Sequence, residues 1–524
     1  MKTFGDWLVS PWRRSLLAVL AGGLPVFAFP APSLWWFAYA ALVPWILLAR
    51  SAPTGRRALY DGWAGGFGFL LVVHSWLLPS LHVFILLIAG LLGALWAPWG
   101  WLVRRYLGGV PSWRRGATAL LVLPSGWLMV ELVRSWQGLG GPWGVLGSTQ
   151  WQVGPALRLA SVGGVWLLSF LVVAVNVAVA VLVGVREARP PAVAALLATA
   201  AVTSAAWVWS PRPDVDGRVR IAVVQPGIVA GDDSADRRFD REEQLTRGLA
   251  GDRPDLVVWG ESSVGFDLAG RPDLARRLAA LARLTKADIL VNVDAERSDR
   301  PGIYKSSILV GPDGPTGDRY DKMRLVPFGE YIPARSLLGW ATSVGKAAGV
   351  DRRRGTEQVV MKVGHGLRIG PLVCFESAFP DMSRHLARDG ADVLVAQSST
   401  SSFQHSWAPE QHATLAALRA AETGRPVVHA TLTGVSAVYG PSGARVGRWL
   451  GTSADTTEVY DIPLAHGVTP YVRYGDWPVH AALLALAAVC VGEGVRAVRP
   501  RGVRPRPLPP LARTVRESPA RPGR

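Results

Sequence analysis

Long apolar stretches constrain the fold of this chain more than any other feature of its 524 residues. A helix needs about 20 mostly apolar residues to cross a hydrocarbon layer of about 30 Å. Stretches that meet or approach this length fill most of the first 209 residues, and one more lies near the C-terminus. They span residues 15–31, 33–49, 62–79, 82–103, 117–135, 160–184, 191–209 and 477–495. Because 49% of the residues are also hydrophobic, the chain is predicted to be a membrane protein with an eight-helix transmembrane domain.

Charges in the loops between these stretches predict their orientation. Arg and Lys gather before the first stretch and in every second loop after it, whereas the alternate loops carry almost no charge. Cytoplasmic loops are enriched in Lys and Arg, so both termini are predicted to be cytoplasmic and residues 210–476 to lie on the outer face. Tryptophans near the ends of the stretches are expected to form interfacial belts, namely Trp35, Trp36, Trp96, Trp99 and Trp101.

The net charge and the cysteine count exclude several classes of protein. The charge is +17, but the C-terminal tail holds eight Arg against a single acidic residue, Glu517, and much of the remainder flanks the apolar stretches. No nucleic-acid partner is therefore predicted. Cys490 lies inside a predicted span and could hardly pair with Cys374, which excludes a disulfide framework. His405 and His412 lack the ligand clustering of a metal site, so neither a metal nor a cofactor is predicted.

Between the seventh and eighth stretches the pattern is that of a soluble α/β domain. Strands are predicted at 218–225, 255–259, 287–293, 303–310, 367–373, 392–397 and 426–431, and helices at 234–249, 271–286 and 406–423. Strands that alternate with helices, together with hairpin turns at 311–314 and 440–443, indicate a layered α/β architecture. The predicted organisation is a transmembrane domain at 1–209, a linker at 210–217, the α/β domain at 218–470, the last span at 477–496 and a disordered Pro/Arg-rich tail at 497–524.

Three chemically active side chains close strand-like segments of the α/β domain. Glu261 follows 255–259, Lys322 follows Tyr320-Asp321, and Cys374 follows 367–373. Open α/β sheets gather their sites at the ends of strands, so these side chains are predicted to meet. Acyl transfer through a thiol needs a nucleophile, a base for its proton and a cation for the oxyanion. Cys374, Glu261 and Lys322 can fill these roles in that order.

Lys322 is expected to act on both the thiolate and the oxyanion. An ammonium about 4 Å from the sulfur, at an effective dielectric constant near 20, contributes about 4 kcal/mol. It would lower the thiol pKa by up to roughly three units before the opposing charge of Glu261 is counted. The chain contains only six Lys among its 56 Lys and Arg residues, so a lysine retained at a strand end is notable. Each of the three residues alone has an ordinary structural explanation, and the prediction rests on their joint pattern.

Motifs around these residues resemble the apolipoprotein N-acyltransferases, which are membrane members of the nitrilase (carbon-nitrogen hydrolase) superfamily. The most specific motif is Arg-Leu-Val-Pro-Phe-Gly-Glu-Tyr-Ile-Pro at 324–333, and a second is Gly-Pro-Trp at 141–143. Gln-His at 411–412, Arg-Ala at 419–420 and Gly-Arg-Pro at 424–426 add to the resemblance. It extends over nearly the whole chain, from the apolar N-terminal half to the last span.

The resemblance implies a fold and a set of site residues. The α/β domain is implied to be an extracytoplasmic αββα sandwich, and Glu261, Lys322 and Cys374 are implied to form its catalytic triad. Glu330 is implied to be a second essential carboxylate oriented toward the lysine. Glu376 is implied to support the nucleophile that it follows.

Three aromatic residues, Phe328, Trp340 and Phe403, are expected to bind the substrate. Trp340 belongs to segment 334–350, which is interpreted either as an arm that dips into the outer leaflet or as an ordinary surface loop. The loop at 398–404, Ser-Ser-Thr-Ser-Ser-Phe-Gln, departs from the family pattern and shares only Phe403 with it. A paralogue with a different acceptor is therefore an alternative.

The leading functional hypothesis is a two-step acyl transfer in the bacterial cytoplasmic membrane. Cys374 would take an acyl group from a glycerophospholipid as a thioester and pass it to the α-amino group of the diacylglyceryl-cysteine of lipoproteins, the last step of their maturation. Both substrates stay in the bilayer, which gives a reason for the membrane domain. Two alternatives are open, a membrane-anchored nitrilase-type amidohydrolase with water as acceptor and a non-catalytic membrane scaffold.

Overall fold

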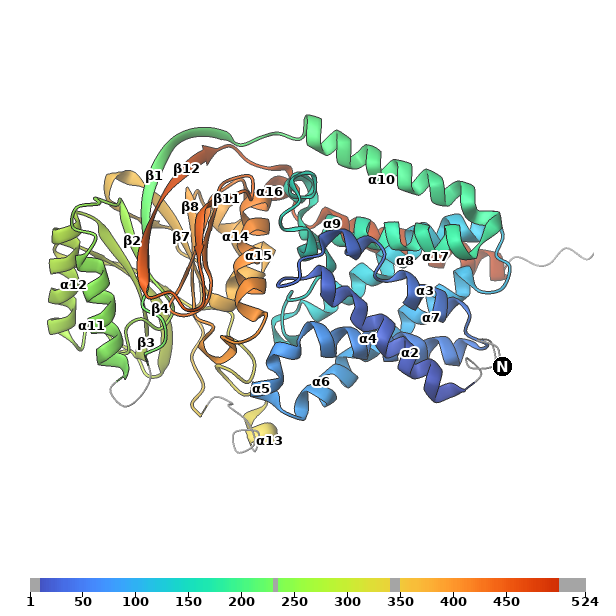
Figure 1. Ribbon diagram of the computed structural model, residues 1–524, viewed down its shortest axis with the longest axis horizontal. Helices are drawn as coiled ribbons and strands as arrows, with labels where there is room; N and C mark the ends of the chain where they lie inside the picture. The colour runs from blue at the N-terminus through green and yellow to red at the C-terminus, as the bar shows by residue number, and fades with distance from the viewer. Residues whose placement is uncertain (1–9, 230–233, 340–348, 499–524) are drawn as a thin grey trace, which may run out of the picture.

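The computed structural model describes residues 10–229, 234–339 and 349–498. These residues form two parts that lie side by side, a bundle of helices and a sandwich of two β-sheets with helices on both outer faces (Figure 1). Helix α10 (Arg189–Trp209) leads from the bundle to the sandwich, and α17 (Trp477–Val498) returns to the bundle. Nearly all of the predicted tail at 497–524 lies outside the described residues.

The bundle contains several helices long enough to cross a membrane. Its further helices are α2 (Pro11–Gly23), α3 (Val43–Arg50), α4 (Gly55–Val73), α5 (Leu78–Leu81), α6 (Phe84–Gly93), α7 (Ala97–Leu107), α8 (Trp113–Arg134) and α9 (Gly154–Gly184). Among the described residues, five helices are long and apolar enough to span a membrane, or six if the pair bent by 62° after Val73 is one span. The predicted count of eight spans thus stays a prediction.

Short 3-10 segments interrupt the first two predicted spans. Helix α2 ends at Gly23 and continues as the 3-10 helix Leu24–Ala28, which contains Pro25. The second stretch begins as the 3-10 helix Trp35–Tyr39, and α3 starts only at Val43. Proline lacks the amide N–H that a continuous helix needs and disrupts the preceding turn. Hydropathy cannot detect this interruption, which explains why both stretches were expected to be longer helices.

The structure corrects the expectation that Trp96 and Trp99 belong to an interfacial belt. Both side chains are fully buried in the bundle. They pack edge to face against Trp127, with ring centroids 5.4 and 5.2 Å apart, and Trp99 also contacts Trp45. The other three tryptophans that were predicted to lie at the interface are exposed, namely Trp35, Trp36 and Trp101.

Helices α2 and α4 approach each other at glycines. A Cβ atom at Gly68 would lie 2.0 Å from the carbonyl oxygen of Val19, and one at Gly22 would lie 1.9 Å from that of Gly65. Small residues commonly permit such close packing of membrane helices. The absence of a side chain at these positions therefore sets the distance between α2 and α4.

Gly68→Ala is expected to destabilise the bundle, because the added methyl group must push α2 away from α4. We expect a loss of about 1–3 kcal/mol, seen as a lower midpoint of thermal unfolding in detergent. Gly90→Ala is the matched control, since nothing lies within 4 Å of the position of its Cβ atom. Equal unfolding midpoints for the two variants would contradict this account of the packing.

Within the described residues, each sheet of the sandwich has six strands. Their orders are β12-β1-β2-β3-β4-β5 and β11-β10-β9-β8-β7-β6. The strands are β1 (Asp214–Gln225), β2 (Leu256–Trp259), β3 (Asp288–Glu296), β4 (Ile303–Gly311), β5 (Gly314–Asp321), β6 (Met361–Lys362), β7 (Arg368–Val373), β8 (Val393–Ser398), β9 (Val427–Thr431), β10 (Ser436–Tyr439), β11 (Arg445–Leu450) and β12 (Thr456–His466). Side chains such as Val223, Val258, Val373 and Val395 form the apolar core between the sheets.

Helices cover the outer face of each sheet. Helices α11 (Ser234–Arg247) and α12 (Pro272–Thr285) cover the first sheet, and α14 (Pro380–Arg388) and α15 (Ala408–Thr423) cover the second, on the side of the bundle (Figure 1). The layers therefore follow the αββα order that the resemblance implies.

Every strand and helix predicted in the α/β segment is present, but some elements were not predicted. The missed elements are β6, β12, α13 (Arg335–Leu338), α14 and α16 (Pro470–Tyr474), whereas β5, β10 and β11 were implied by the two hairpin turns without bounds of their own. Strand β12 contains Pro463, which argues against a strand in sequence, yet β12 is an edge strand, where proline is tolerated. Strand β1 begins at Asp214, inside the predicted linker at 210–217, because pairing with β12 extends to Asp214 and His466.

Residues of the family motifs join the sandwich to the bundle. The Trp143 indole donates to Gln411 Oε1 at 2.9 Å, and Gln411 Nε2 donates to the Pro30 carbonyl at 2.9 Å. The amide of Val165, in α9, donates to Glu422 Oε1 at 2.7 Å, and Arg419 pairs with the same carboxylate. These buried contacts fix α15, and the sheet beneath it, against the bundle.

Candidate active site

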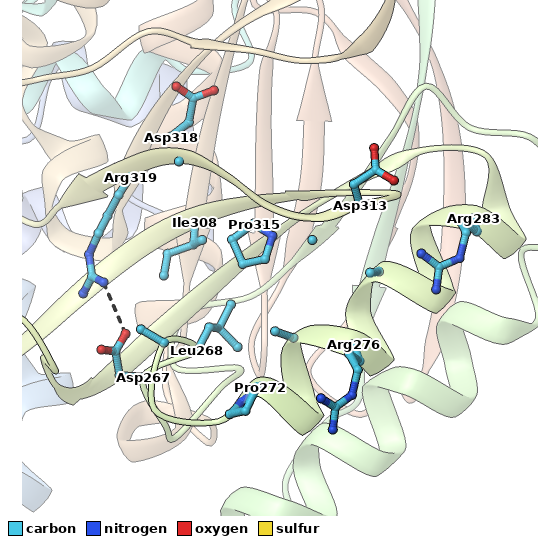
Figure 2. Close-up of a pocket in the computed structure, with 15 residues that line it drawn as sticks. Asp267, Leu268, Pro272, Arg276, Arg283, Ile308, Asp313, Pro315, Asp318 and Arg319 are labelled. Carbon is cyan, nitrogen blue, oxygen red and sulfur yellow. Dashed lines mark hydrogen bonds and ion pairs between the residues drawn. The ribbon is translucent and has the colours of Figure 1, made fainter.

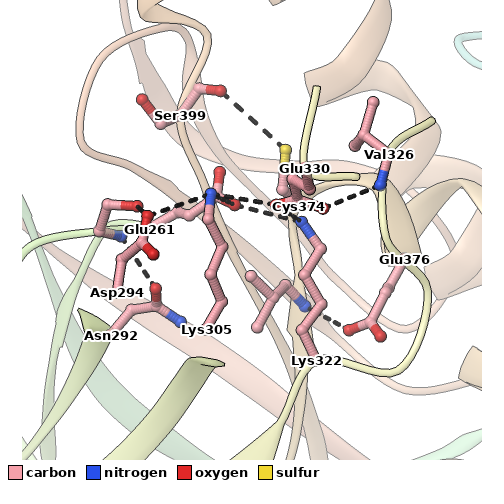
Figure 3. A network of polar contacts seen from close by, with 12 residues as sticks. Glu261, Asn292, Asp294, Lys305, Lys322, Val326, Glu330, Cys374, Glu376 and Ser399 are labelled. Atoms are coloured by element: carbon pink, nitrogen blue, oxygen red, sulfur yellow. Dashed lines mark hydrogen bonds and ion pairs between the residues drawn. The ribbon is translucent and has the colours of Figure 1, made fainter. Parts of the chain in front are cut away.

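The three predicted catalytic side chains come together between the ends of β2, β5 and β7. Lys322 Nζ lies 3.2 Å from Glu261 Oε1 (Figure 3), and the Cys374 thiol is close enough to the Glu261 carboxylate for each group to shift the pKa of the other. Glu261 and Lys322 are buried, whereas Cys374 is half-buried and faces a cavity. The structure thus brings the three side chains into one cluster, and their catalytic roles stay a prediction.

Cys374 occupies a strained turn that exposes its sulfur. The residue has φ of +51°, in the left-handed region, where β7 passes into the short 3-10 helix Cys374–Ala378. Non-glycine residues in this region are uncommon and need support from their surroundings. Glu376 Oε2 accepts the Val373 amide at 2.8 Å, and His412 Nε2 lies 3.0 Å from the Cys374 carbonyl oxygen. The sequence analysis did not predict this contact of His412.

Glu376 also holds the segment that carries Lys322. Its Oε1 accepts hydrogen bonds from the Tyr320 hydroxyl at 2.7 Å, the Met323 amide at 2.8 Å and the Arg324 amide at 3.0 Å. One fully buried carboxylate therefore ties the end of β5 to the end of β7. This geometry agrees with the supporting role expected for Glu376.

Glu330 points toward the lysine, as expected. Its Oε1 accepts from Lys322 Nζ at 2.8 Å, and its Oε2 accepts the Val326 amide at 2.8 Å. The second bond closes the turn of the Val-Pro-Phe-Gly-Glu motif on itself. Glu330 is therefore fixed by its own loop while it contacts the ammonium.

A second lysine, the half-buried Lys305 in β4, enters the cluster and was not predicted. Its Nζ lies 2.8 Å from Glu261 Oε1 and 3.1 Å from Glu330 Oε1 (Figure 3). The rarity of lysine in this chain was the one available signal. Lys305 lies near the start of β4 rather than at its carboxyl end, so the strand-end rule did not select it.

Burial and the charges of the two lysines act on the pKa of the Cys374 thiol in opposite directions. Burial raises the pKa of Cys374 to about 12, and the charge of Glu261 adds to this effect while Lys322 opposes it. For Glu261, burial would raise the pKa, but Lys305 and Lys322 outweigh burial and lower it. Burial and Glu261 thus favour the protonated form of the thiol, whereas the two lysines favour the ionised form of Glu261.

An apolar cavity of about 430 Å³ connects Cys374 with the bundle. Its walls include Leu70, Ile85 and Leu91 of the bundle and Phe328 and Phe403 of the sandwich. Leu91 is 65% exposed, so the cavity reaches the outer surface of α6. Two of the three predicted substrate-binding residues therefore line it, whereas Trp340 lies outside the described residues, as does most of segment 334–350.

The loop at 398–404 forms one wall of the same cavity. Ser399, Thr400 and Phe403 line it, and the Ser399 carbonyl oxygen lies 4.0 Å from the sulfur. The departure of this loop from the family pattern is thus located beside the nucleophile. Phe403 packs edge to face on Trp76, with ring centroids 4.8 Å apart.

A separate cavity of about 490 Å³ lies on the outer side of the first sheet, between α12 and the β4–β5 hairpin (Figure 2). The ion pair between Asp267 and Arg319, at 3.3 Å, closes one end, and Arg276 and Arg283 line the rest. None of the described residues around it is a predicted site residue or a nucleophile. The cavity at Cys374 is therefore the candidate active site. No group of three His, Cys, Asp or Glu that could hold a metal occurs among the described residues.

Comparisons with known proteins identify the family of both parts. Residues 220–467 match the carbon-nitrogen hydrolase family model, and residues 21–178 match the model of the apolipoprotein N-acyltransferase N-terminal domain. The apolipoprotein N-acyltransferase of Geobacter metallireducens is 32% identical over 515 residues, which cover 92% of this chain and 96% of that protein. The enzyme of the same name from Azotobacter vinelandii is 31% identical, over 96% of this chain and 98% of that protein. The chain therefore belongs to the apolipoprotein N-acyltransferase family, within the nitrilase superfamily.

Proposed function

We propose that the protein transfers a fatty acyl group from a glycerophospholipid to the free α-amino group of the diacylglyceryl-cysteine of lipoproteins, through a thioester on Cys374. The observation that carries this proposal is the apolar cavity, which leads from the sulfur to the outer surface of α6. Such a cavity suits an acyl chain that remains partly in the bilayer. A small polar amide would need more polar groups to orient it than this cavity offers.

In the first step the sulfur attacks the ester carbonyl of the phospholipid. The C–S bond forms and the C–O ester bond breaks, so that the lysophospholipid leaves as an alcohol. Glu261 takes the thiol proton and delivers it to the departing alkoxide oxygen. Lys322 faces the developing oxyanion, and loss of one such group typically costs about 2.7–4 kcal/mol in the transition state.

In the second step the amine of the acceptor attacks the thioester. The C–N amide bond forms and the C–S bond breaks, while Glu261 takes the amine proton and returns it to the sulfur. Water must be kept from the thioester between the two steps. The apolar walls around Cys374 support such exclusion, because they offer few partners to water.

We also propose that the helices form eight spans and that the sandwich lies on the outer face of the bacterial cytoplasmic membrane, with both termini inside. The distribution of Arg between the apolar stretches supports this orientation. In such an arrangement the catalytic domain is residues 218–470, and the cavity at Cys374 faces the outer leaflet, where both lipid substrates are held.

Purified protein incubated with phospholipid is expected to gain the mass of one fatty acyl group. The thioester should form in a single turnover and persist, because no acceptor is present. Addition of a diacylated lipopeptide should then return the protein to its original mass and yield the N-acylated peptide. Intact-protein mass spectrometry measures both events.

The same measurement separates the alternatives. Discharge by buffer alone, as fast as by the lipopeptide, would favour the amidohydrolase. A matched lipopeptide whose α-amino group is already acetylated is the control, and it should leave the acyl group on the protein. No mass gain with any phospholipid would contradict the proposed donor.

A further inference from the structure

We propose that Lys305 is a positioning residue that keeps Glu261 ionised and directs one of its two carboxylate oxygens to the thiol. This inference rests on the proposed role of Glu261 as the base. It assigns a function to a side chain that is not one of the three triad members.

The contacts of Lys305 form a closed ring of four alternating charges. Lys305 Nζ lies 2.8 Å from Glu261 and 3.1 Å from Glu330, while Lys322 Nζ lies 3.2 Å from Glu261 and 2.8 Å from Glu330 (Figure 3). Two carboxylates and two ammonium groups therefore balance within one buried site. Without Lys305, two carboxylates would share a single cation.

Such an imbalance has a known consequence in a buried site. Two carboxylates that are close together cannot both remain ionised unless cations compensate them, and one then takes up a proton. A protonated Glu261 could not accept the proton of the thiol or of the amine. The second ammonium is therefore needed so that the base is ready at neutral pH.

The two lysines contact the same oxygen of Glu261. Lys305 Nζ and Lys322 Nζ both donate to Oε1, at 2.8 and 3.2 Å. This arrangement turns the carboxylate so that Oε2 is the oxygen that can receive a proton. A single lysine would fix this rotation less firmly, because two bonds from different directions restrain it better than one.

Several other groups face Glu261 and set the charge that it experiences. Asp294 of β3 lies 3.8 Å from Lys305 and is itself paired with Arg352 at 3.3 Å. Burial lowers the pKa of His412 to about 4, so this side chain of α15 is neutral. The groups around Glu261 are thus Asp294 from β3, Lys305 from β4, Lys322 after β5, Glu330 from the following loop, Cys374 after β7 and His412 from α15.

The sign of the expected pH effect follows from these charges. Lys305 and Lys322 lower the pKa of Glu261, and both oppose the effect of burial. Removal of Lys305 must therefore raise the pKa of Glu261. Acylation needs the ionised carboxylate, so its rate is lost as the pH falls through this pKa. The acidic limb of the pH–rate profile should move to higher pH.

The test uses the full-length protein in detergent and measures acylation of Cys374 between pH 3 and 8.5. The acyl donor is p-nitrophenyl butyrate, an activated ester, and intact-mass spectrometry gives the rate at each pH. The variants are Lys305→Met, Lys305→Gln and Lys305→Arg. Lys362→Met is the matched control, because Lys362 is an exposed lysine of the same domain.

For Lys305→Met and Lys305→Gln we expect the acidic limb of the pH–rate profile to shift to higher pH by about one to three units. Lys305→Arg keeps the charge and should retain the limb of the original protein, as should Lys362→Met. The proposal would be overturned if Lys305→Met and Lys305→Gln lowered the rate but left the acidic limb at its original pH. It would also be overturned if Lys305→Arg shifted the limb as far as these two variants do. The use of Gln beside Met keeps the test valid if one variant folds poorly.

The choice of donor separates this inference from the proposed function. If p-nitrophenyl butyrate acylates Cys374 but phospholipid does not, the proposed donor is wrong, while the role of Lys305 is still tested. If phospholipid acylates the original protein and the limb of Lys305→Met is unmoved, the role of Lys305 is wrong and the acyl transfer stands.

Discussion

Cys374→Ala is expected to abolish acyl loading and N-acyl transfer together, because the variant lacks the atom that would carry the acyl group. Removal of the nucleophile of a covalent mechanism typically lowers turnover by about 10⁶. The backbone turn should survive, since alanine at φ of +51° meets the same restriction as cysteine. Loss of the mass gain with phospholipid, and of the N-acylated lipopeptide, would be measured on the same samples.

The second cysteine provides the control for this prediction. Cys490 is exposed in α17 and far along the chain from the site. Cys490→Ala should load and transfer the acyl group like the original protein. If Cys374→Ala still formed the N-acylated lipopeptide at a comparable rate, the thioester route would be wrong and direct attack by the amine would replace it.

The strand ends of the α/β domain could be predicted because their signal is local. The runs before Glu261 and Cys374 are apolar and β-branched, and they end where a polar residue appears. Parallel strands such as β7 and β8 place their carboxyl ends at one edge. Sequence therefore predicts that all three residues lie at strand ends. Glu261 and Lys322 follow strands of one sheet and Cys374 follows a strand of the other, so the packing of the two sheets brings these ends together.

Lys305 could not be found in the same way, because its role depends on a contact across the fold. It lies inside β4, where alternation decides which face a side chain takes, and Glu261 follows a strand that is not its neighbour in the sheet. The contact of His412 with the Cys374 carbonyl could not be predicted for the same reason, because it joins a helix to a turn 38 residues away. Tertiary packing alone brings such pairs together.

The net direction of the shift in the thiol pKa could not be predicted, because burial acts on it beside the charges of Lys322 and Glu261. The sequence offers Lys322 as a cation near the sulfur, but it gives neither the depth of burial nor the position of Glu261. Burial is the largest influence on the pKa of Cys374, and the carboxylate adds to it. A pKa shift that is argued from neighbouring charges in the sequence leaves out desolvation, which shifts the pKa of every buried ionisable group.

Glu261→Gln is expected to lower acyl transfer by about 10²–10⁴, the range that general acid–base catalysis usually contributes. The amide has the shape of the carboxylate and can still contact the two lysines through its oxygen. It cannot accept a proton from the thiol or from the attacking amine. The rate of N-acylation of the lipopeptide, with phospholipid as donor, measures the loss.

The same substitution should have the opposite effect on the ionisation of the thiol. Glu261 raises the pKa of Cys374, whereas Lys322 and Lys305 lower it, so removal of the carboxylate charge lowers this pKa. More thiolate is then present at pH 7.5, and alkylation of Cys374 by iodoacetamide should become faster than in the original protein. A side chain that served only to hold the fold would slow both reactions or neither.

Faster alkylation combined with slower acyl transfer is therefore the result that identifies Glu261 as the base. Glu458→Gln is the matched control, because Glu458 pairs with Arg448 on strands β12 and β11 and has no contact with the cluster. It should change neither rate. If Glu261→Gln slowed alkylation and transfer in parallel, the carboxylate would be needed to ionise the sulfur rather than to move protons during transfer. If transfer were unchanged, another group would have to be the base, and Glu330 is the remaining carboxylate of the cluster, held 2.8 Å from Lys322.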